Sequence, residues 1–466
     1  MNTSFFRMPP PHRISFVTLA CCLFFSLMAT AQSPVFNPAP QSESKLRSLE
    51  QQFETQYKAS LAQLPSQNKK DYVSLYDSRW EHIKSKFEKK EIYTASFAQQ
   101  YLDNLVQEIV KVNPPLQKQS LHCYFSRSGI PNASYIGEGI ILFNMGLFTS
   151  LENESQVIFV LCHELAHYYL QHSENGIARY VTTMNGKDIQ AELRKIKATE
   201  YKKREQLEKL VKGITFDSRR HSRDHESEAD SMGLVFMHNT RFSLEGALSA
   251  LNLLDKIDVD TSNTAAQLEQ LFNTKEYPFK KRWINKREGL LGGHANLEKD
   301  KEPEDSLKTH PDCQLRIKLL APYVKANEGT NRALNISNKV KFDSLRHAFK
   351  YEVIVYAYEN DNYTRSLYYT LSMLQEAPND PYLVTQIGKI LNGCYDAQKT
   401  HTLGKVSELP APDNPASYNV VLQMVQNLYL EEFPAISYYY LGGFSAKMNT
   451  YPAFVREYNK AKQLNQ

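Results

Sequence analysis

Residues 157–170 constrain the fold more than any other part of the chain. They combine an apolar run, which is typical of a buried helix, with one His-Glu-x-x-His motif. Four residues are slightly more than one helical turn, so His163 and His167 project from the same face and can bind one metal ion. Glu164 is rotated by about 100° from His163 around the axis. The stretch therefore predicts a buried helix with two metal ligands and a neighbouring carboxylate.

This arrangement predicts the chemistry of a zinc peptidase. Neutral imidazole suits zinc, and two histidines with one further protein ligand leave a fourth position for water or substrate. Zinc lowers the pKa of such a water towards about 7, and Glu164 would take its proton during attack on a carbonyl. The alternative is a chance pattern on an ordinary helix, so the interpretation depends on a third ligand elsewhere.

Residues 223–233 can supply that ligand. On a helix, Glu226 and Asp230 share a face, while Glu228 lies on the far side. A carboxylate here could be the third zinc ligand, and Asp230 could accept the other ring N–H of a ligating histidine. His225 is the rival ligand, although it is rotated away if Glu226 faces inward; an acidic surface turn is the remaining alternative. Two small residues would let this helix lie against the metal helix, which carries His163 and His167; they are Ala229 and Gly233.

Several motifs then occur in a specific order within about residues 95–325. They are Asn132-Ala133, Gly137-x-Gly139, Gly146-Leu147, Glu152-Asn153-Glu154, His163-Glu164-Leu165-Ala166-His167 and Glu226-x-x-Ala229-Asp230. This order resembles the HtpX and CAAX-prenyl-protease family of zinc metallopeptidases, and is most similar to its Oma-like branch, which includes exported bacterial members. The resemblance implies a mainly helical, zincin-like catalytic domain with a small sheet (α+β) and one Zn2+. It implies His163, His167 and Glu226 as ligands, Glu164 as general base and Asp230 as the partner of a ligating histidine.

The family pattern continues at His310, which lies between Thr309 and Pro311. We expect this histidine either to donate a hydrogen bond to the oxyanion of the tetrahedral intermediate or to plug the fourth zinc position. A surface histidine that stabilises its own turn is the alternative. Arg316 follows six residues later, and a charged insertion over residues 280–307 departs from the family pattern.

The segment before the metal helix predicts a small sheet. Residues 121–125 are typical of a strand, residues 132–135 are extended, and residues 140–143 form a strand that leads into a helix. An edge strand beside a zinc site can hold a substrate extended by main-chain pairing. The candidate substrate-binding residues are Gly139, Ile140, Ile141, Leu142 and Phe143. A plain core strand is the alternative.

The remaining segments predict helices. Apolar spacing indicates buried helical faces between residues 45 and 112, and the metal helix is expected to run on to His172 and Ser173. Residues 187–212 are densely charged and predict a solvent-exposed helix or helical hairpin near the cleft. From about residue 334 the chain is helical and rich in tyrosine, with a weak resemblance to tetratricopeptide repeats; an irregular helical bundle is the alternative.

The N-terminal residues predict export. Arg7 and Arg13 precede an apolar core, and Ala29-Thr30-Ala31 forms a small-x-small cleavage site. A retained membrane anchor is the alternative, but the apolar span is short. The bacterial periplasm is therefore the expected location. The expected division is a signal peptide at 1–31, a linker at 32–44, a zinc metallopeptidase domain at 45–330 and a helical domain at 331–466.

Composition narrows the partners. The formal net charge is +4 and basic residues are interleaved with acidic ones, which gives no argument for nucleic acid. Four cysteines beyond the signal permit one or two disulfides: Cys123, Cys162, Cys313 and Cys394. The predicted function is an endopeptidase acting on polypeptides, such as misfolded or unassembled envelope proteins, with peripheral membrane association and oligomeric state left open. A binding or chaperone-like module with a structural zinc is the alternative.

Overall fold

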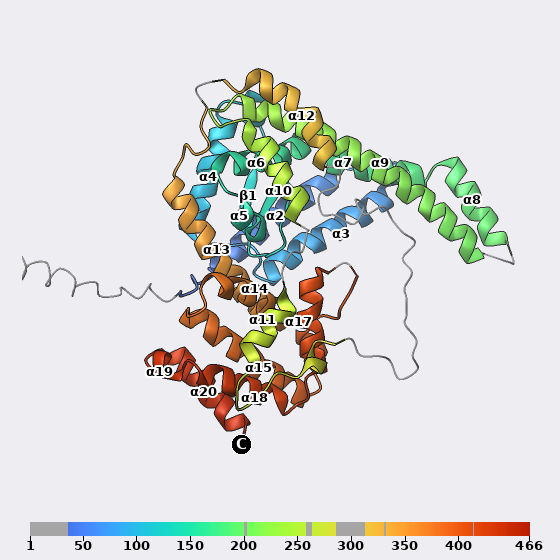
Figure 1. Ribbon diagram of the computed structural model, residues 1–466. Coiled ribbons are helices and arrows are strands. Elements are labelled where there is room, and N and C mark those ends of the chain that lie inside the picture. The colour runs from blue at the N-terminus through green and yellow to red at the C-terminus, as the bar shows by residue number, and fades with distance from the viewer. Residues whose placement is uncertain (1–35, 200–202, 258–262, 286–312, 330–331, 413) are drawn as a thin grey trace, which may run out of the picture. The chain divides into compact units, whose positions relative to one another are not determined.

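The computed structural model describes residues 36–199, 203–257, 263–285, 313–329, 332–412 and 414–466 (Figure 1). The chain divides into a short N-terminal unit, residues 1–37, and a compact unit, residues 38–466. In the described ranges, the compact unit is mainly helical with a three-stranded sheet, so the predicted fold class is confirmed. None of the described helices is long and apolar enough to cross a membrane. The predicted signal peptide lies outside the described residues.

Three amphipathic helices precede the sheet, as the apolar spacing predicts. They are α2 (Glu43–Ala62), α3 (Lys69–Glu88) and α4 (Ser96–Val110). The helix α2 begins where the Ser42 hydroxyl accepts a hydrogen bond from the Lys45 amide, which satisfies one of the free N–H groups of the first turn. It packs along α3, so that Phe53 contacts the ring of Phe87 in a small core beside the sheet.

The sheet contains β1 (His122–Ser126), β2 (Ala133–Gly137) and β3 (Ile140–Asn144) in the order β1-β3-β2. The strand β3 is parallel to β1 and antiparallel to β2. Its main chain is therefore paired on both sides, so the expectation that residues 139–144 form an edge strand is wrong. The physical reason is burial: a continuous apolar run suits a central strand, whose two faces are both covered.

The connection from β2 to β3 requires glycine. Gly137 and Gly139 have φ angles of 104° and 72°, in the region that side chains rarely adopt. A Cβ on Gly139 would lie 2.2 Å from the Ser120 carbonyl oxygen. The two glycines thus permit a tight return that places β2 at the edge of the sheet.

A short helix and the metal helix follow the sheet directly. They are α5 (Met145–Ser150) and α6 (Glu154–Tyr169). The helix α6 begins at Asn153, whose side chain accepts a hydrogen bond from the Gln156 amide at 3.1 Å. It is buried on nearly every face because β2, α9 and α10 (Glu245–Ile257) pack around it.

The metal helix ends earlier than expected. The sequence predicts continuation to Ser173, but α6 stops at Tyr169 and α7 (His172–Met184) begins after a break. Gln171 takes the left-handed conformation with φ 55°, which a continuing helix cannot contain. This break reverses the chain, so His172 turns back towards α6.

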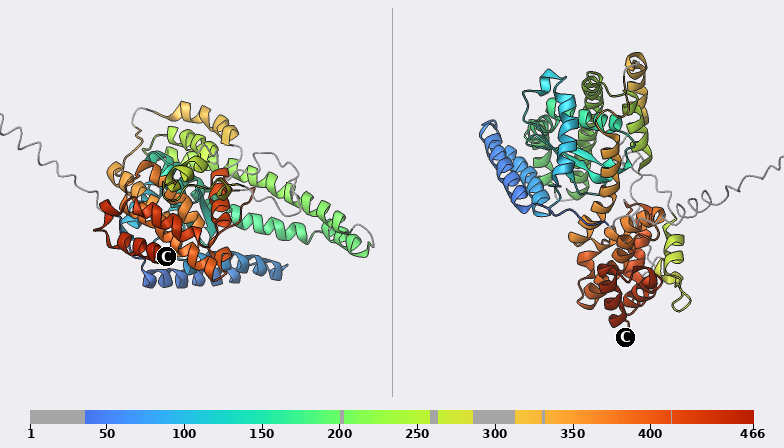
Figure 2. Two further views of the ribbon diagram at one scale, coloured as in Figure 1. Left: turned by 60° about the horizontal axis from the view of Figure 1, so that its bottom comes forward. Right: turned by 90° about the vertical axis from the view of Figure 1, so that its left-hand side faces the viewer.

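The helices α8 (Lys187–Ala198) and α9 (Lys203–His238) form the hairpin predicted over residues 187–212, as Figures 1 and 2 show. The helix α9 then continues along α6. A Cβ on Gly233 would lie 3.0 Å from the His163 amide nitrogen and 3.1 Å from the Cys162 carbonyl carbon. The two backbones therefore approach closely at the turn that carries the first histidine of the motif.

Successive helices pack together in the C-terminal part of the chain. They are α12 (Cys313–Asn327), α13 (Lys339–Glu359), α14 (Tyr363–Glu376), α15 (Pro381–Lys399), α16 (Leu403–Val406), α17 (Ala416–Asn427), α18 (Glu432–Gly442), α19 (Ser445–Met448) and α20 (Pro452–Leu464). Contacts cross residue 330: α13 packs on α5, and α11 (Thr264–Phe272) packs on α17 and α18. The short 3-10 helix η2 (Lys281–Trp283) also packs on α17. The domain division at 330 and the tetratricopeptide resemblance stay predictions.

The four cysteines of the described chain are buried thiols, and no disulfide joins any two of them. Cys162 lies next to His163 on α6 and is fully buried. Burial raises the pKa of its thiol well above the usual value, because the thiolate would be poorly solvated. Cys162 therefore fills space in the core.

Candidate metal centre

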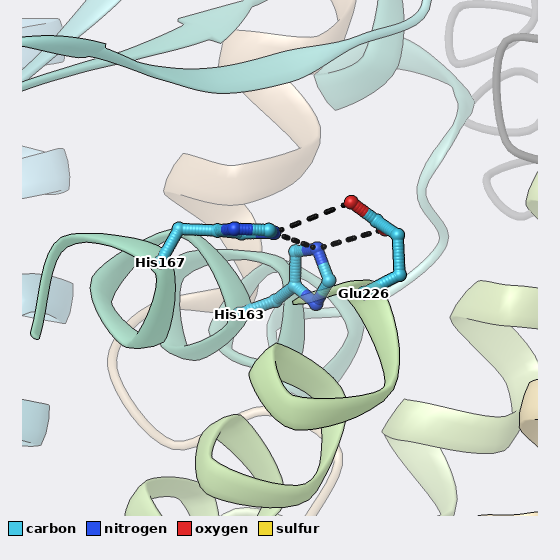
Figure 3. A group of neighbouring side chains, drawn as sticks. All are labelled: His163, His167 and Glu226. Atoms are coloured by element: carbon cyan, nitrogen blue, oxygen red, sulfur yellow. Dashed lines mark hydrogen bonds and ion pairs between the residues drawn. The ribbon is translucent and has the colours of Figure 1, made fainter. Parts of the chain in front are cut away.

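The structure brings together the three predicted ligands. His163 and His167 project from α6, and Glu226 projects from α9 towards them (Figure 3). The Glu226 carboxylate oxygens lie 3.5 Å from His163 Nε2 and 3.4 Å from His167 Nε2. One potential ligand atom from each residue lies within 4.8 Å of the others. Two nitrogens and one carboxylate oxygen therefore converge on a single point between two helices.

These residues fit a zinc ion. His163 Nδ1 donates to Asp230 Oδ1 at 2.9 Å, so Nε2 is the nitrogen that a metal would take. That atom lies 3.1 Å from His167 Nε2, beside the Glu226 carboxylate. Donor atoms this close together can share one cation. Two imidazoles and a carboxylate are also a donor set of catalytic zinc sites with one position left open.

In the metal-free protein, burial and hydrogen bonds determine which residues of the site are charged. Burial opposes a charged His163, but its hydrogen bonds with Asp230 and Glu226 raise its pKa to about 10. Glu226 has the opposite shift: burial disfavours its charge, yet the hydrogen bonds with both histidines hold its pKa well below the usual range. The carboxylate is thus ionised and available to a cation.

A buried ion pair holds the centre in place. Asp230 accepts from Arg316 Nε at 2.6 Å and from Arg316 Nη2 at 2.7 Å, so the guanidinium binds it with two parallel bonds. Arg316 Nη1 also lies 3.3 Å from Glu226. Burial would raise the pKa of Asp230, but the hydrogen bonds from Arg316 and His163 lower it. Arg316 on α12 therefore fixes two carboxylates of α9 at once.

Glu164 lies between the ligands and the sheet. Its Oε2 accepts a hydrogen bond from the Tyr135 amide of β2 at 2.8 Å. Burial raises the pKa of Glu164, while the neighbouring His163 and His167 lower it; the net direction is upward. The predicted base is therefore oriented by the main chain of an adjacent strand.

The strand beside the centre is β2 and not β3. Tyr135 directs its N–H to Glu164, whereas its Cα pairs in register with Ile141 of β3 on the other side. The outer edge of β2 thus faces the centre. Sequence reasoning missed this because the central and edge strands are only two residues apart along the chain.

His172 is a further residue of the site that sequence reasoning did not assign. Its Nδ1 lies 2.9 Å from His167 Nδ1. On an unbroken helix, a residue five positions beyond His167 would lie about 140° away around the axis. Only the break at Gln171 returns His172 to this place, and helical periodicity gives no signal of it. The other predicted histidine, His310, lies outside the described residues.

These donor atoms, with a buried carboxylate oriented between them and a strand edge, fit a metallopeptidase site. Residues 96–323 match the model of peptidase family M48. This part of the chain is therefore an M48 domain, of the family that comprises the HtpX, CAAX-protease and Oma zinc metallopeptidases, and the predicted resemblance is confirmed. The range contains every predicted ligand and Glu164. Among curated proteins, no match was found.

Proposed function

We propose that this protein is a zinc-dependent endopeptidase that cleaves polypeptides in the bacterial cell envelope. One observation carries the proposal: Glu164 is fixed by the Tyr135 amide beside the converging His163, His167 and Glu226. A base between a three-ligand metal set and a strand edge has the components that peptide hydrolysis requires.

The chain's own residues would perform the proton transfers. His163, His167 and Glu226 would hold a zinc ion, which would supply an activated water and polarise the scissile carbonyl. Glu164 would hold the proton of that water on its carboxylate and pass it to the leaving amine. Its raised pKa brings the carboxyl closer to neutral pH, where it can both accept and release a proton. Asp230 would keep the His163 ring in the tautomer that leaves Nε2 for the metal.

The edge of β2 is the proposed binding strand for an extended substrate. It replaces residues 139–144, which are paired on both sides in the centre of the sheet. Main-chain pairing along an edge recognises a peptide whatever its side chains, so it suits unfolded or unassembled proteins. This choice of substrate also agrees with the signal-like residues 1–31, which support export to the periplasm.

The test compares the unmodified protein with Glu164→Gln, using zinc content by mass spectrometry and cleavage of an unfolded protein such as casein. The variant should bind about one zinc per chain, because its ligands remain, and should lose roughly 10²–10⁴-fold in cleavage rate because the base is removed. Undiminished cleavage by the variant would end this mechanism. Zinc binding without cleavage by either protein would favour the chaperone-like alternative.

A further inference from the structure

A second group of imidazoles and a carboxylate lies beside the metal centre. His172 of α7 meets His225 and Glu228 of α9, with potential ligand atoms within 4.8 Å of one another. The group borders a surface cavity of about 510 Å³ that Leu170 and Arg179 also line. Its residue types equal those of the metal centre, so the question is whether it binds a second metal or serves the first.

The ring geometry of this group argues against a metal. The rings of His172 and His225 are stacked, with centroids 4.2 Å apart and planes only 7° apart. A ligating nitrogen points its lone pair within its own ring plane, so two parallel rings cannot both aim at one ion. In the metal centre, by contrast, the rings of His163 and His167 are inclined at 77° and their Nε2 atoms face each other.

The hydrogen bonds instead form a chain that starts at a metal ligand. His167 Nδ1 lies 2.9 Å from His172 Nδ1, and His172 Nε2 lies 3.1 Å from a Glu228 carboxylate oxygen. If His167 gives Nε2 to the metal, its proton is on Nδ1 and is donated to His172. His172 must then carry its own proton on Nε2, which is the atom that reaches Glu228. One assignment of protons satisfies every contact.

We propose that His172 and Glu228 are positioning residues that hold His167 in the tautomer and orientation needed to bind the metal. This inference rests on the proposed metal site. His172 does for His167 what Asp230 does for His163, so each ligating histidine has its own partner. Such partners fix the ring and raise its basicity as a ligand.

The burial of the two side chains predicts which of them contributes more to metal binding. The His172 side chain is 6% exposed, whereas the Glu228 side chain is 61% exposed. Water can replace a carboxylate at an exposed position, but it cannot easily replace the buried acceptor at His172. Loss of His172 should therefore weaken metal binding more than loss of Glu228.

The experiment measures zinc affinity of the full chain by chelator competition, together with the absorption spectrum of the Co2+-substituted protein. His172→Leu should weaken zinc binding by roughly 10–100-fold and alter the Co2+ spectrum. His172→Asn offers an amide oxygen at about the position of Nδ1 and should recover most of the affinity. Glu228→Gln should weaken binding by less than about 10-fold. His225→Leu, which removes the ring that stacks on His172, is the matched control and should keep full affinity.

Three results would overturn the inference. They are unchanged affinity in His172→Leu, equal losses in His172→Leu and His172→Asn, or a second zinc that His225→Leu removes. Thermal melts of the metal-free variants separate a lost partner from a lost fold, since His172→Asn and His172→Leu should melt within a few degrees of each other. Affinity is independent of cleavage. A protein whose zinc affinity depends on His172 but which cleaves nothing would contradict the proposed function and leave this inference standing.

Discussion

Two clusters of identical composition lie next to each other between α6, α7 and α9, and they differ in every physical respect that matters to a metal. Each contains two histidines and one glutamate. In the first, the rings are inclined and the nitrogens converge; in the second, the rings are parallel and the nitrogens do not. Behind the first lies the buried Asp230–Arg316 pair, whereas Glu228 of the second is exposed to solvent. The orientation and burial of the side chains, and not their residue types, therefore distinguish the proposed metal ligands from the residues that position them.

The largest expected effect comes from the glutamates. Glu226→Ala removes one of three ligands, so zinc should be lost on gel filtration, far beyond the roughly 10–100-fold weakening typical of outer partners. Glu228→Ala, only two residues away on the same helix, is the matched control and should retain zinc. Metal analysis of both purified variants checks this. Zinc retained by Glu226→Ala would place the third ligand elsewhere and break the comparison.

An intermediate effect is expected from Arg316, which supports only the first cluster. Arg316→Leu takes the guanidinium away from the buried Asp230 and the half-buried Glu226, so the metal-free protein should lose about 3–5 kcal/mol of unfolding free energy. Arg47→Leu breaks an exposed pair with Glu43 and should leave the unfolding free energy nearly unchanged. Urea denaturation of both variants measures the difference. Equal losses would show that the pair beneath the metal centre is not special.

The smallest expected effect is on the protonation of two histidines in the metal-free protein. Hydrogen bonds with Asp230 and Glu226 outweigh burial and raise the pKa of His163 to about 10, whereas burial and the nearby His167 and His225 lower that of His172 to about 4. His163 should therefore remain charged at pH 8 and His172 neutral at pH 5.5, although both would titrate near 6.5 in an unfolded chain. Histidine-selective NMR between pH 5 and 9 would detect this.

The sign of the stability change differs for the two histidines. The raised pKa of His163 stabilises the metal-free fold below about 6.5, and this contribution is lost as the pH rises through about 10. The lowered pKa of His172 has the opposite effect. Between about pH 6.5 and 4 the imidazole is protonated in the unfolded chain but not in the folded one, so stability falls as the pH drops through this range. Two histidines that both titrate near 6.5 would contradict the opposite environments assigned to the clusters.

Much of this arrangement could be predicted from local spacing. The interval between His163 and His167 defines one helix face, and the interval between Glu226 and Asp230 defines another. Small residues at Ala229 and Gly233 indicate that two helices approach closely. Both predictions depend on regular helix geometry, which a sequence encodes directly. The helical hairpin over residues 187–212 was predictable for the same reason.

Features that depend on a break or on strand order were not predictable in this way. The left-handed Gln171 carries no glycine signal, so its consequence for His172 appears only in three dimensions. The sequence predicted β3 as the edge strand, but β2 takes that position. Strand order is set by how the chain crosses over and not by the strands themselves. The continuous apolar run over residues 140–143 nevertheless favoured a central strand.

The close contact at Gly233 determines how near α9 lies to the turn of α6 that carries His163. Zinc coordination tolerates errors of only about 0.2 Å in its bond lengths. A methyl group at Gly233 would meet the His163 backbone at 3.0–3.1 Å, a separation that normally forces neighbours to yield by a few tenths of an ångström. The missing side chain at Gly233 therefore lets α9 lie close to the turn of α6 that carries His163.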